Sequence, residues 1–135
     1  MNKTLIELHI PDFDKALKFY SLLGFKKVWS EADYLVLQFE DNILAFYGNS
    51  EKIFQHSHFK QFPKDTPRGY GVEVVIFTKH IETLYQAIQN KIEIVSTLQL
   101  KPWGKRDFRI VDPFGFYLRI TESYNPLKQT PKLRS

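Results

Sequence analysis

The chain has 135 residues, of which 43% are hydrophobic and 16% aromatic, so it has enough apolar material for the core of one small domain. The absence of cysteine excludes a disulfide scaffold, a thiolate zinc site and a cysteine nucleophile. The apolar runs are too short for a transmembrane helix, and the N-terminus shows no hydrophobic core of a signal peptide. We therefore expect a soluble, cytoplasmic protein. The formal net charge is +4, but three of these charges belong to Lys128, Lys132 and Arg134 near the C-terminus. The nearly neutral remainder argues against nucleic acid as a partner.

The first part of the chain reads as a strand, a helix and three more strands. Residues 5–10 alternate between apolar and polar, which predicts a half-buried strand with Ile6 on its apolar face. Asp12 is a good N-cap for the helix that follows. Apolar residues recur at helical spacing up to Leu23, and Gly24 suits the C-terminal cap. The three strands are expected over residues 25–29, 34–39 and 43–47.

The same order of elements restarts after a connector. A strand over residues 72–77 precedes a helix over residues 78–90, which Asn90 can close in a left-handed conformation. Three strands then follow over residues 93–97, 106–111 and 116–121. The aromatic residues of the connector indicate a short helix or a packed loop, and the tail is expected to be extended or frayed.

The repetition indicates the domain organisation. An offset of 68 residues aligns Leu5 with Glu73 and Leu8 with Ile76, as in an internal repeat. We expect one α+β domain in which two βαβββ modules share a core. Its parts are module one (residues 1–48), a connector (49–69), module two (70–122) and a tail (123–135).

Two segments resemble a known superfamily. The run Lys18-Phe19-Tyr20-Ser21-Leu22-Leu23-Gly24-Phe25 is similar to the opening of the vicinal oxygen chelate superfamily. The runs Pro102–Phe108 and Asp112–Leu118 look like its closing signature. The superfamily includes glyoxalases, extradiol dioxygenases, fosfomycin-resistance enzymes and bleomycin-resistance proteins. The resemblance spans residues 4–122 and implies paired βαβββ modules, often in a dimer, whose curved mixed sheet surrounds a cavity.

The resemblance also suggests what the cavity does not hold. In the enzymes of the superfamily, four side chains from the first and last strands of each module bind a divalent metal. Those positions map to Leu5, Ala45, Glu73 and Arg119. Leucine and alanine have no donor atoms, and arginine is a fixed cation that repels a divalent ion. The sequence therefore predicts no metal and no cofactor, as in the non-catalytic, bleomycin-resistance branch.

Strand parity gives the residues that face the cavity without reference to the family. The polar face of each strand presents Glu7, His9, Tyr47, Glu73, Phe77, Tyr117 and Arg119. Such a mixture of aromatic and few polar groups is typical of a small-molecule site. The resemblance places the strands of Glu73 and Arg119 side by side, and we hypothesise that these residues form an ion pair where relatives hold a metal. The alternatives are an ordinary cross-strand salt bridge, or a free Arg119 that binds a ligand carboxylate or phosphate.

Three further features allow two interpretations each. Trp103 and Arg106 could cover a ligand, by stacking and by pairing with an anion, or Trp103 could cap the core or a dimer interface. His56 and His58 have the spacing of two metal ligands, but no third ligand lies near them in the sequence, which favours a surface loop. His9 could be a general acid or base, or a structural histidine.

Together these features favour a homodimeric, metal-free protein that sequesters an aromatic or anionic organic ligand in a dimer-associated cavity, as in antibiotic resistance. We expect no catalytic residue and no membrane partner. One alternative is an enzyme, either a metal-dependent lyase or dioxygenase or a metal-free catalyst that uses Glu7 or His9. Another is an interaction module with a vestigial cavity. Basic residues outnumber acidic ones beside the expected cavity, which favours a negatively charged ligand: Lys101, Lys105, Arg106, Arg109 and Arg119.

Overall fold

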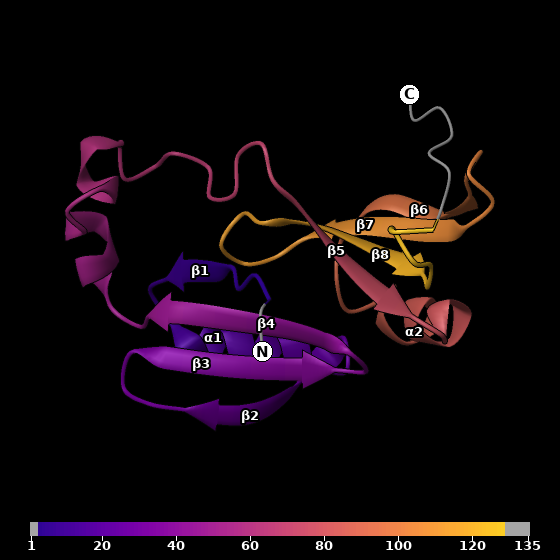
Figure 1. Ribbon diagram of the computed structural model, residues 1–135, viewed down its shortest axis with the longest axis horizontal. Coiled ribbons are helices and arrows are strands. Elements are labelled where there is room, and N and C mark those ends of the chain that lie inside the picture. Colours follow the sequence, from indigo (N-terminus) through magenta and orange to yellow (C-terminus); the bar gives the residue numbers. More distant parts are fainter. Residues whose placement is uncertain (1–2, 129–135) are drawn as a thin grey trace. The chain divides into compact units, whose positions relative to one another are not determined.

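The computed structural model describes residues 3–128, which form two compact units divided between Pro67 and Arg68 (Figure 1). Each unit contains a strand, an α-helix and three further strands, in that order. The strands of each unit form one four-stranded mixed sheet. The expected paired βαβββ fold is therefore confirmed. Lys132 and Arg134, which carry part of the positive charge of the tail, lie outside the described residues.

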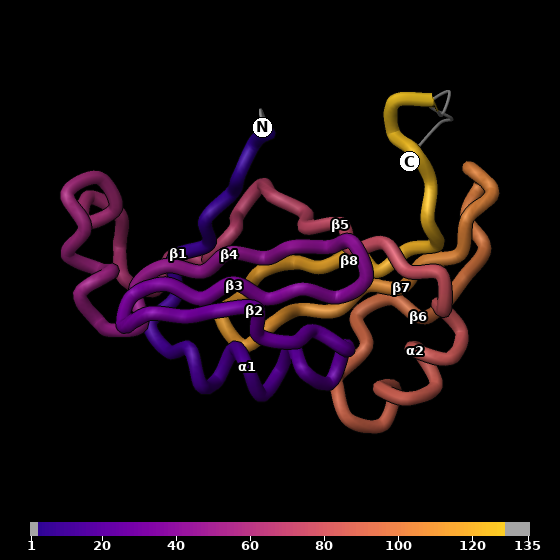
Figure 2. The backbone as a smooth tube through the Cα atoms, turned by 60° about the horizontal axis from the view of Figure 1, so that its bottom comes forward, coloured from indigo at the N-terminus to yellow at the C-terminus, as the bar shows by residue number. Residues whose placement is uncertain are grey.

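The elements of the first unit are β1 (Glu7–Ile10), α1 (Phe13–Leu22), β2 (Lys26–Ser30), β3 (Tyr34–Phe39) and β4 (Asn42–Gly48). The strand order is β1-β4-β3-β2, with β1 parallel to β4 and the other pairs antiparallel (Figure 2). As predicted, Asp12 caps α1, since its side chain accepts a hydrogen bond from the Lys15 backbone N–H. Tyr20 of α1 is fully buried and its ring lies 5.4 Å from that of Phe46, so α1 covers one face of the sheet.

Two short 3₁₀ helices, η1 (Glu51–Gln55) and η2 (Phe59–Gln61), form the connector. The side chain of Ser50 caps η1 by accepting a hydrogen bond from the backbone N–H of Lys52. Ile53 of η1 is buried. The connector is thus a packed segment with short helices, as the aromatic composition predicted.

The second unit repeats the arrangement with β5 (Glu73–Thr78), α2 (Ile81–Ile88), β6 (Ile94–Leu100), β7 (Arg106–Val111) and β8 (Tyr117–Glu122). Its strand order is β5-β8-β7-β6, and β5 is parallel to β8. Tyr85 of α2 contacts Phe108 of β7 edge-on, with ring centroids 5.0 Å apart. Phe108, Ile110, Leu118 and Ile120 are fully buried, so the core of this unit lies between α2 and its sheet.

Several predicted boundaries are wrong. The β1–β4 ladder begins at Glu7 opposite Ala45, so Leu5 and Ile6 have no ladder partner and are 59% and 67% exposed. The second helix is shorter than residues 78–90, because Thr78 still belongs to β5 and its hydroxyl accepts a hydrogen bond from the His80 backbone N–H.

Two further details differ at the ends of elements. Among the described non-glycine residues, positive φ angles occur at Glu40 and Asn49 and not at Asn90, so Asn90 does not close α2 in a left-handed conformation. The beginning of the tail is packed rather than frayed, because the ring of Tyr124 contacts that of Phe77 at 5.0 Å. Within the described residues no helix is both long and apolar enough to span a membrane.

Candidate functional site

Each sheet has one face on its helix and a second face turned away from it, which we call the open face. In the second unit Phe108 packs on α2, and side chains alternate along a strand, so Asp107 and Arg109 belong to the open face. The register of β5, β8 and β7 extends this face across the three strands. Its members are Glu73, Val75, Phe77, Asp107, Arg109, Val111, Tyr117, Arg119 and Thr121. All four open-face positions predicted in this unit (Glu73, Phe77, Tyr117, Arg119) therefore share one surface.

Four of these side chains form an ionic cluster, which consists of Glu73, Asp107, Arg109 and Arg119. Glu73 Oε1 lies 3.1 Å from Arg109 Nε and 3.3 Å from Arg119 Nε. Asp107 Oδ1 lies 3.2 Å from Arg109 Nη1, and Asp107 Oδ2 lies 3.9 Å from Arg119 Nη1. Each carboxylate thus contacts both guanidinium groups, and the formal charges of the cluster cancel.

The members of the ionic cluster differ in burial. The side chains of Asp107 and Arg119 are 0% and 3% exposed, whereas that of Glu73 is 28% exposed. Asp107 Oδ2 and Arg119 Nε are buried and lie near opposite charges, but neither has a partner in hydrogen-bond geometry. Burial raises the pKa of the Asp107 carboxyl, and the charges of Arg109, Lys101 and Arg119 oppose that rise.

The hypothesised ion pair between Glu73 and Arg119 is present. It is diagonal, since Glu73 lies opposite Tyr117 in the ladder and Arg119 lies opposite Val75. Arg119 is not a free cation, because its guanidinium contacts two carboxylates and its Nη2 donates to the hydroxyl oxygen of Tyr124 at 3.5 Å. A role of the pair in ligand binding stays a prediction.

The positions that the resemblance assigns to a metal do not fit one. Leu5 lies outside β1, Ala45 has no donor atom, and the one carboxylate, Glu73, contacts two arginines. A divalent cation beside these guanidinium groups would meet repulsion instead of ligands. Among residues 3–128 no group of three or more histidine, aspartate or glutamate side chains is arranged to hold a metal ion. No chemical step is therefore assigned to a metal.

The open face of the first sheet is aromatic. Its ladder brings Glu7 opposite Ala45 and His9 opposite Tyr47, so the predicted residues Glu7, His9 and Tyr47 share this face. Trp29 and Tyr34 add a stacked pair, with ring centroids 5.2 Å apart and an interplanar angle of 10°. A hydrogen bond with Glu7, together with burial and the charge of Glu7, raises the pKa of Tyr34 to about 12.

The connector covers part of this aromatic face at His9. The His9 ring lies 5.0 Å from Tyr47, 5.3 Å from His56 and 5.0 Å from Phe59. Sequence reasoning favoured a surface loop for His56 and His58 because no third ligand lies near them in the sequence, whereas the structure brings the His56 ring against His9. The Nδ1 atom of His56 accepts a hydrogen bond from the His58 backbone N–H at 3.1 Å, so His56 orders the turn between η1 and η2.

Arg106 lies apart from the open-face residues. Because it is two residues from Phe108 in β7, it lies on the helix-facing side of the sheet. Its guanidinium pairs with Glu82 of α2 and Glu122 of β8, both at 3.3 Å. Its backbone N–H also donates to Glu122 Oε1 at 2.6 Å, and these bonds lower the pKa of the Glu122 carboxyl. Trp103 is half-buried in the turn between β6 and β7. The structure does not bring Arg106 together with the ionic cluster, and a lid formed with Trp103 stays a prediction.

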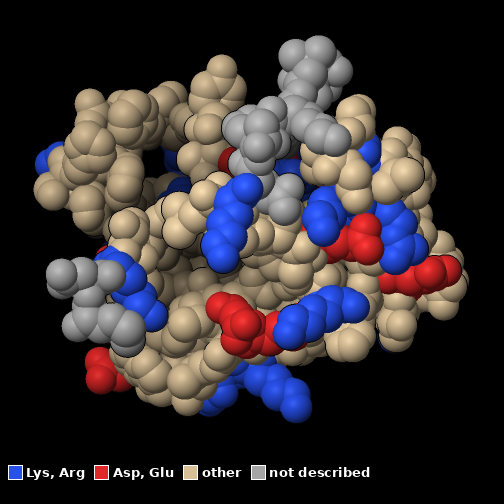
Figure 3. All heavy atoms as spheres, turned by 45° about the vertical axis from the view of Figure 1, so that its right-hand side comes forward, with Lys and Arg blue, Asp and Glu red and all other residues tan. Residues whose placement is uncertain are grey.

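Two polar members of the site were missed by sequence reasoning. Asp107 was not selected at all, and Arg109 entered only as one of several basic residues. The alternating pattern of residues 106–111 could have revealed them. The apolar Phe108 and Ile110 predict the side of the strand that faces the helix, so Asp107 and Arg109 are predicted on the opposite, open face. The expected basic wall is largely neutralised by carboxylates, and Figure 3 shows acidic side chains directly beside basic ones.

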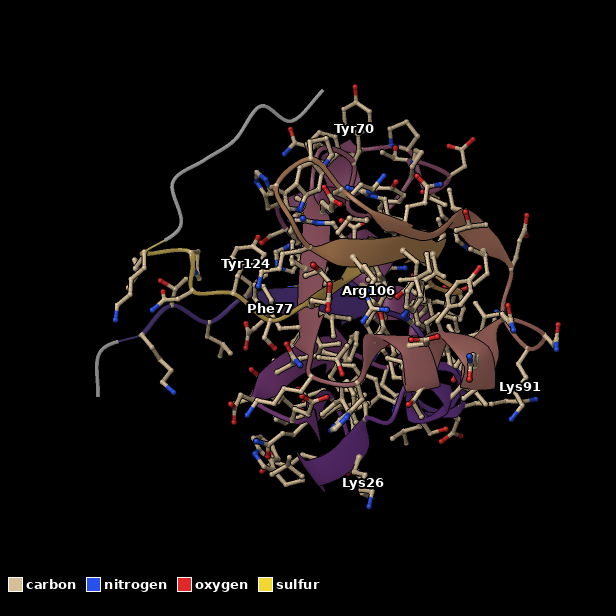
Figure 4. The ribbon with its side chains drawn as sticks, turned by 90° about the vertical axis from the view of Figure 1, so that its right-hand side faces the viewer. Lys26, Tyr70, Phe77, Lys91, Arg106 and Tyr124 are labelled. Atoms are coloured by element: carbon tan, nitrogen blue, oxygen red, sulfur yellow. The ribbon has the colours of Figure 1, made fainter. Side chains whose placement is uncertain are left out.

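Tyr124 is a further residue that sequence reasoning missed. It belongs to the segment after β8 and lies against Phe77 on the open face of the second sheet (Figure 4). No periodic pattern marks this segment in the sequence. A single aromatic residue after a strand gives no signal of where its ring packs.

The two units define a protein built from paired βαβββ modules, each with a helix-covered face and an open face. Residues 5–120 match the model of the Glyoxalase/Bleomycin resistance protein/Dioxygenase superfamily. The chain belongs to this superfamily. Among the curated proteins, none matches the sequence significantly.

Solved structures share the fold at low sequence identity. A protein of unknown function from Agrobacterium tumefaciens str. C58 has a TM-score of 0.74 and 18% identity, covering 92% of this chain and 95% of that one. A bleomycin-binding protein in complex with bleomycin has a TM-score of 0.64 and 22% identity, covering 92% and 100%. A bleomycin resistance determinant encoded on the transposon Tn5 gives the same score and identity, covering 93% and 100%.

Proposed function

We propose that this chain is a metal-free small-molecule-binding protein that sequesters an aromatic or anionic organic ligand. It resembles bleomycin-resistance proteins in this respect, and its biological role would be resistance to a toxic compound. The cavity is associated with a homodimer, as the resemblance implies. The protein acts in the cytoplasm. The observation that carries the proposal is the ionic cluster. At two positions where metal-dependent relatives bind an ion, Glu73 and Arg119 form an ion pair instead.

The chemistry of the two open faces supports this choice. Trp29 and Tyr34 present stacked rings in the first unit, and Trp29 is 46% exposed. Large exposed aromatic side chains are suited to stacking on a flat organic ligand. In the second unit the guanidinium groups of Arg109 and Arg119 supply charge-assisted hydrogen-bond donors. The first face suits a flat aromatic ring, and the second suits an acidic group.

A ligand screen on the purified wild-type protein tests the proposal. Thermal shift against aromatic acids, antibiotics and glutathione conjugates should identify compounds that raise the melting temperature saturably, because a ligand that binds the folded state stabilises it. Trp29→Ala should weaken the binding of such a compound about tenfold or more, a loss of about 1.4 kcal/mol. The matched control is Tyr70→Ala, which removes an aromatic ring that is 88% exposed.

The same preparation distinguishes the enzyme alternative. We expect no stoichiometric divalent metal by elemental analysis, and recovery of the bound ligand chemically unchanged. A metal content near one per chain, or conversion of a bound compound into a product, would contradict the proposal and support a lyase or dioxygenase.

A further inference from the structure

We propose that Arg109 and Arg119 form an anion site that the Glu73 carboxylate occupies from within the chain, and that the carboxylate or phosphate of an organic ligand replaces Glu73 on binding. This inference rests on the proposed function, since it names the subsite and the chemical group that the ligand presents there. It concerns the second unit alone.

The register of the sheet creates the need for an anion. Arg109 of β7 and Arg119 of β8 lie directly opposite each other in the antiparallel ladder. Two like charges at such positions repel and destabilise the sheet. A single oxygen, Glu73 Oε1, lies 3.1 Å from one Nε atom and 3.3 Å from the other. The two guanidinium groups therefore converge on one carboxylate oxygen.

Charge balance gives the number of anions that this position requires. Asp107 lies on the same face, is fully buried and contacts the Nη1 atom of each arginine. These contacts keep Asp107 in place as an internal counter-ion. Without Glu73, the two arginines and Asp107 carry a net charge of +1. The position between the two Nε atoms thus takes one negative charge, whether it comes from Glu73 or from a ligand.

The two carboxylates differ in how readily they can be displaced. Asp107 lies within β7, as its second residue, and has no exposed side-chain surface. Glu73 is the first residue of β5 and is 28% exposed. Glu73 can therefore rotate away from the cluster at lower cost than Asp107.

Aromatic groups beside the anion position indicate the class of ligand. The Tyr124 hydroxyl accepts a hydrogen bond from Arg119 Nη2 at 3.5 Å, and its ring lies edge-on to Phe77 at 5.0 Å (Figure 4). An acidic group bound between the arginines would bring its organic part close to these rings. Aromatic carboxylates are thus suitable probes, and benzoate is the simplest.

The experiment removes the internal carboxylate and supplies one from solution. Glu73→Ala and the isosteric Glu73→Gln are each titrated with sodium benzoate at constant ionic strength. We expect benzoate to raise the melting temperature of both variants saturably, by about 3 °C or more, with an affinity at least tenfold above that of the wild type. Neutral benzamide should have no such effect.

Two control variants separate anion capture from a general response to salt. Glu51→Ala removes a carboxylate from an exposed ion pair with Lys64 and should respond to benzoate no more than the wild type does. Glu73→Gln combined with Arg109→Gln should lose the response of the single variant. The inference is overturned if the Glu73 variants respond to benzoate no more than Glu51→Ala does, or if the double variant still responds.

The outcomes also separate this inference from the proposed function. If compounds bind the wild type but the Glu73 variants gain no affinity for benzoate, the anion site is wrong and the binding function stands. If the Glu73 variants capture benzoate and no compound in the screen binds the wild type, the anion site stands and the binding function loses its support.

Discussion

At the scale of single residues, Gly48 is the position where backbone conformation and packing leave least freedom. It ends β4 with a φ of +122°, which side chains of L-residues rarely permit. A β-carbon at this position would come within 2.8 Å of the Ile10 backbone oxygen and would collide with the Ile53 side chain. The absence of a side chain thus lets the connector pack against β1.

Gly48→Ala should therefore destabilise the protein. Backbone strain and the collision together should lower the free energy of unfolding by about 3 kcal/mol or more, as measured by urea denaturation. Gly104→Ala is the matched control, because Gly104 has a φ of +86° but no atom lies within 4 Å of its β-carbon position. It should cost only the backbone strain, about 1 kcal/mol, and an equal loss in both variants would contradict the role of packing at Gly48.

Glu122 makes a charged hydrogen bond whose contribution depends on pH. The Arg106 backbone N–H and guanidinium both donate to its carboxylate, which lowers its pKa below the ordinary value of 4.5. A lowered carboxyl pKa stabilises the folded state above pH 4.5, and this stabilisation is lost as the pH falls through the pKa of the folded state.

Glu122→Gln should lower the free energy of unfolding by about 1 kcal/mol at pH 7, with allowance for partial solvent exposure. The gap between wild type and variant should narrow steadily below pH 4.5 in denaturant titrations. Glu51→Gln, which alters an exposed ion pair with Lys64, should show a smaller gap at pH 7. A gap for Glu122→Gln that widens in acid would contradict the assigned direction of the pKa shift.

At the scale of elements, the connector is attached to the first sheet through aromatic rings. Phe59 of η2 contacts His9 of β1 at 5.0 Å and His56 at 4.7 Å. Phe62, at the C-terminal end of η2, is 50% exposed and its nearest described ring partner is His58 at 6.0 Å. Phe59 is thus the ring that links η2 to β1.

Phe59→Ala should release η2 from the sheet while the fold of the first unit persists. Because the turn loses its contact with His9, we expect limited proteolysis within residues 56–67 to become about tenfold faster. Phe62→Ala removes a ring of the same size from the same segment and should have little effect. Equal acceleration in both variants would show that the contact with His9 does not hold η2.

Local patterns predicted most elements, whereas the assembly of the site required information about register. Asp12 and Gly24 bracket α1 as expected, since capping depends on neighbouring residues alone. Glu73 and Arg109 are 36 positions apart in the sequence, and nothing local indicates that β5 and β7 flank β8. The resemblance predicted that the strands of Glu73 and Arg119 are neighbours. That Asp107 and Arg109 belong to the ionic cluster became clear only from the observed pairing of β7 with β8.

At the scale of the whole molecule, the two repeats share the apolar character of their helix-facing residues and differ on their open faces. Each unit buries its own set of apolar side chains under its own helix, with Phe46 in the first and Phe108 in the second fully buried. The open face is aromatic around Trp29 and Tyr34 in the first unit and ionic around Glu73 and Arg109 in the second. Packing constrains the buried parts of the covered faces, so the repeats differ most in chemistry on their open faces.

Because each unit buries apolar side chains under its own helix, we predict that damage to one unit remains largely local. Phe108→Leu should cost about 1 kcal/mol, and native-state hydrogen exchange should show lower protection in β5, β7 and β8 than in the wild type, with little change in β1, β3 and β4. Phe46→Leu is the mirror experiment and should reverse the pattern, since Phe46 packs on Tyr20 of α1. If either substitution lowers protection equally in both units, the two units share one cooperative core, as the sequence suggested, and their amide hydrogens exchange through a common opening of both units.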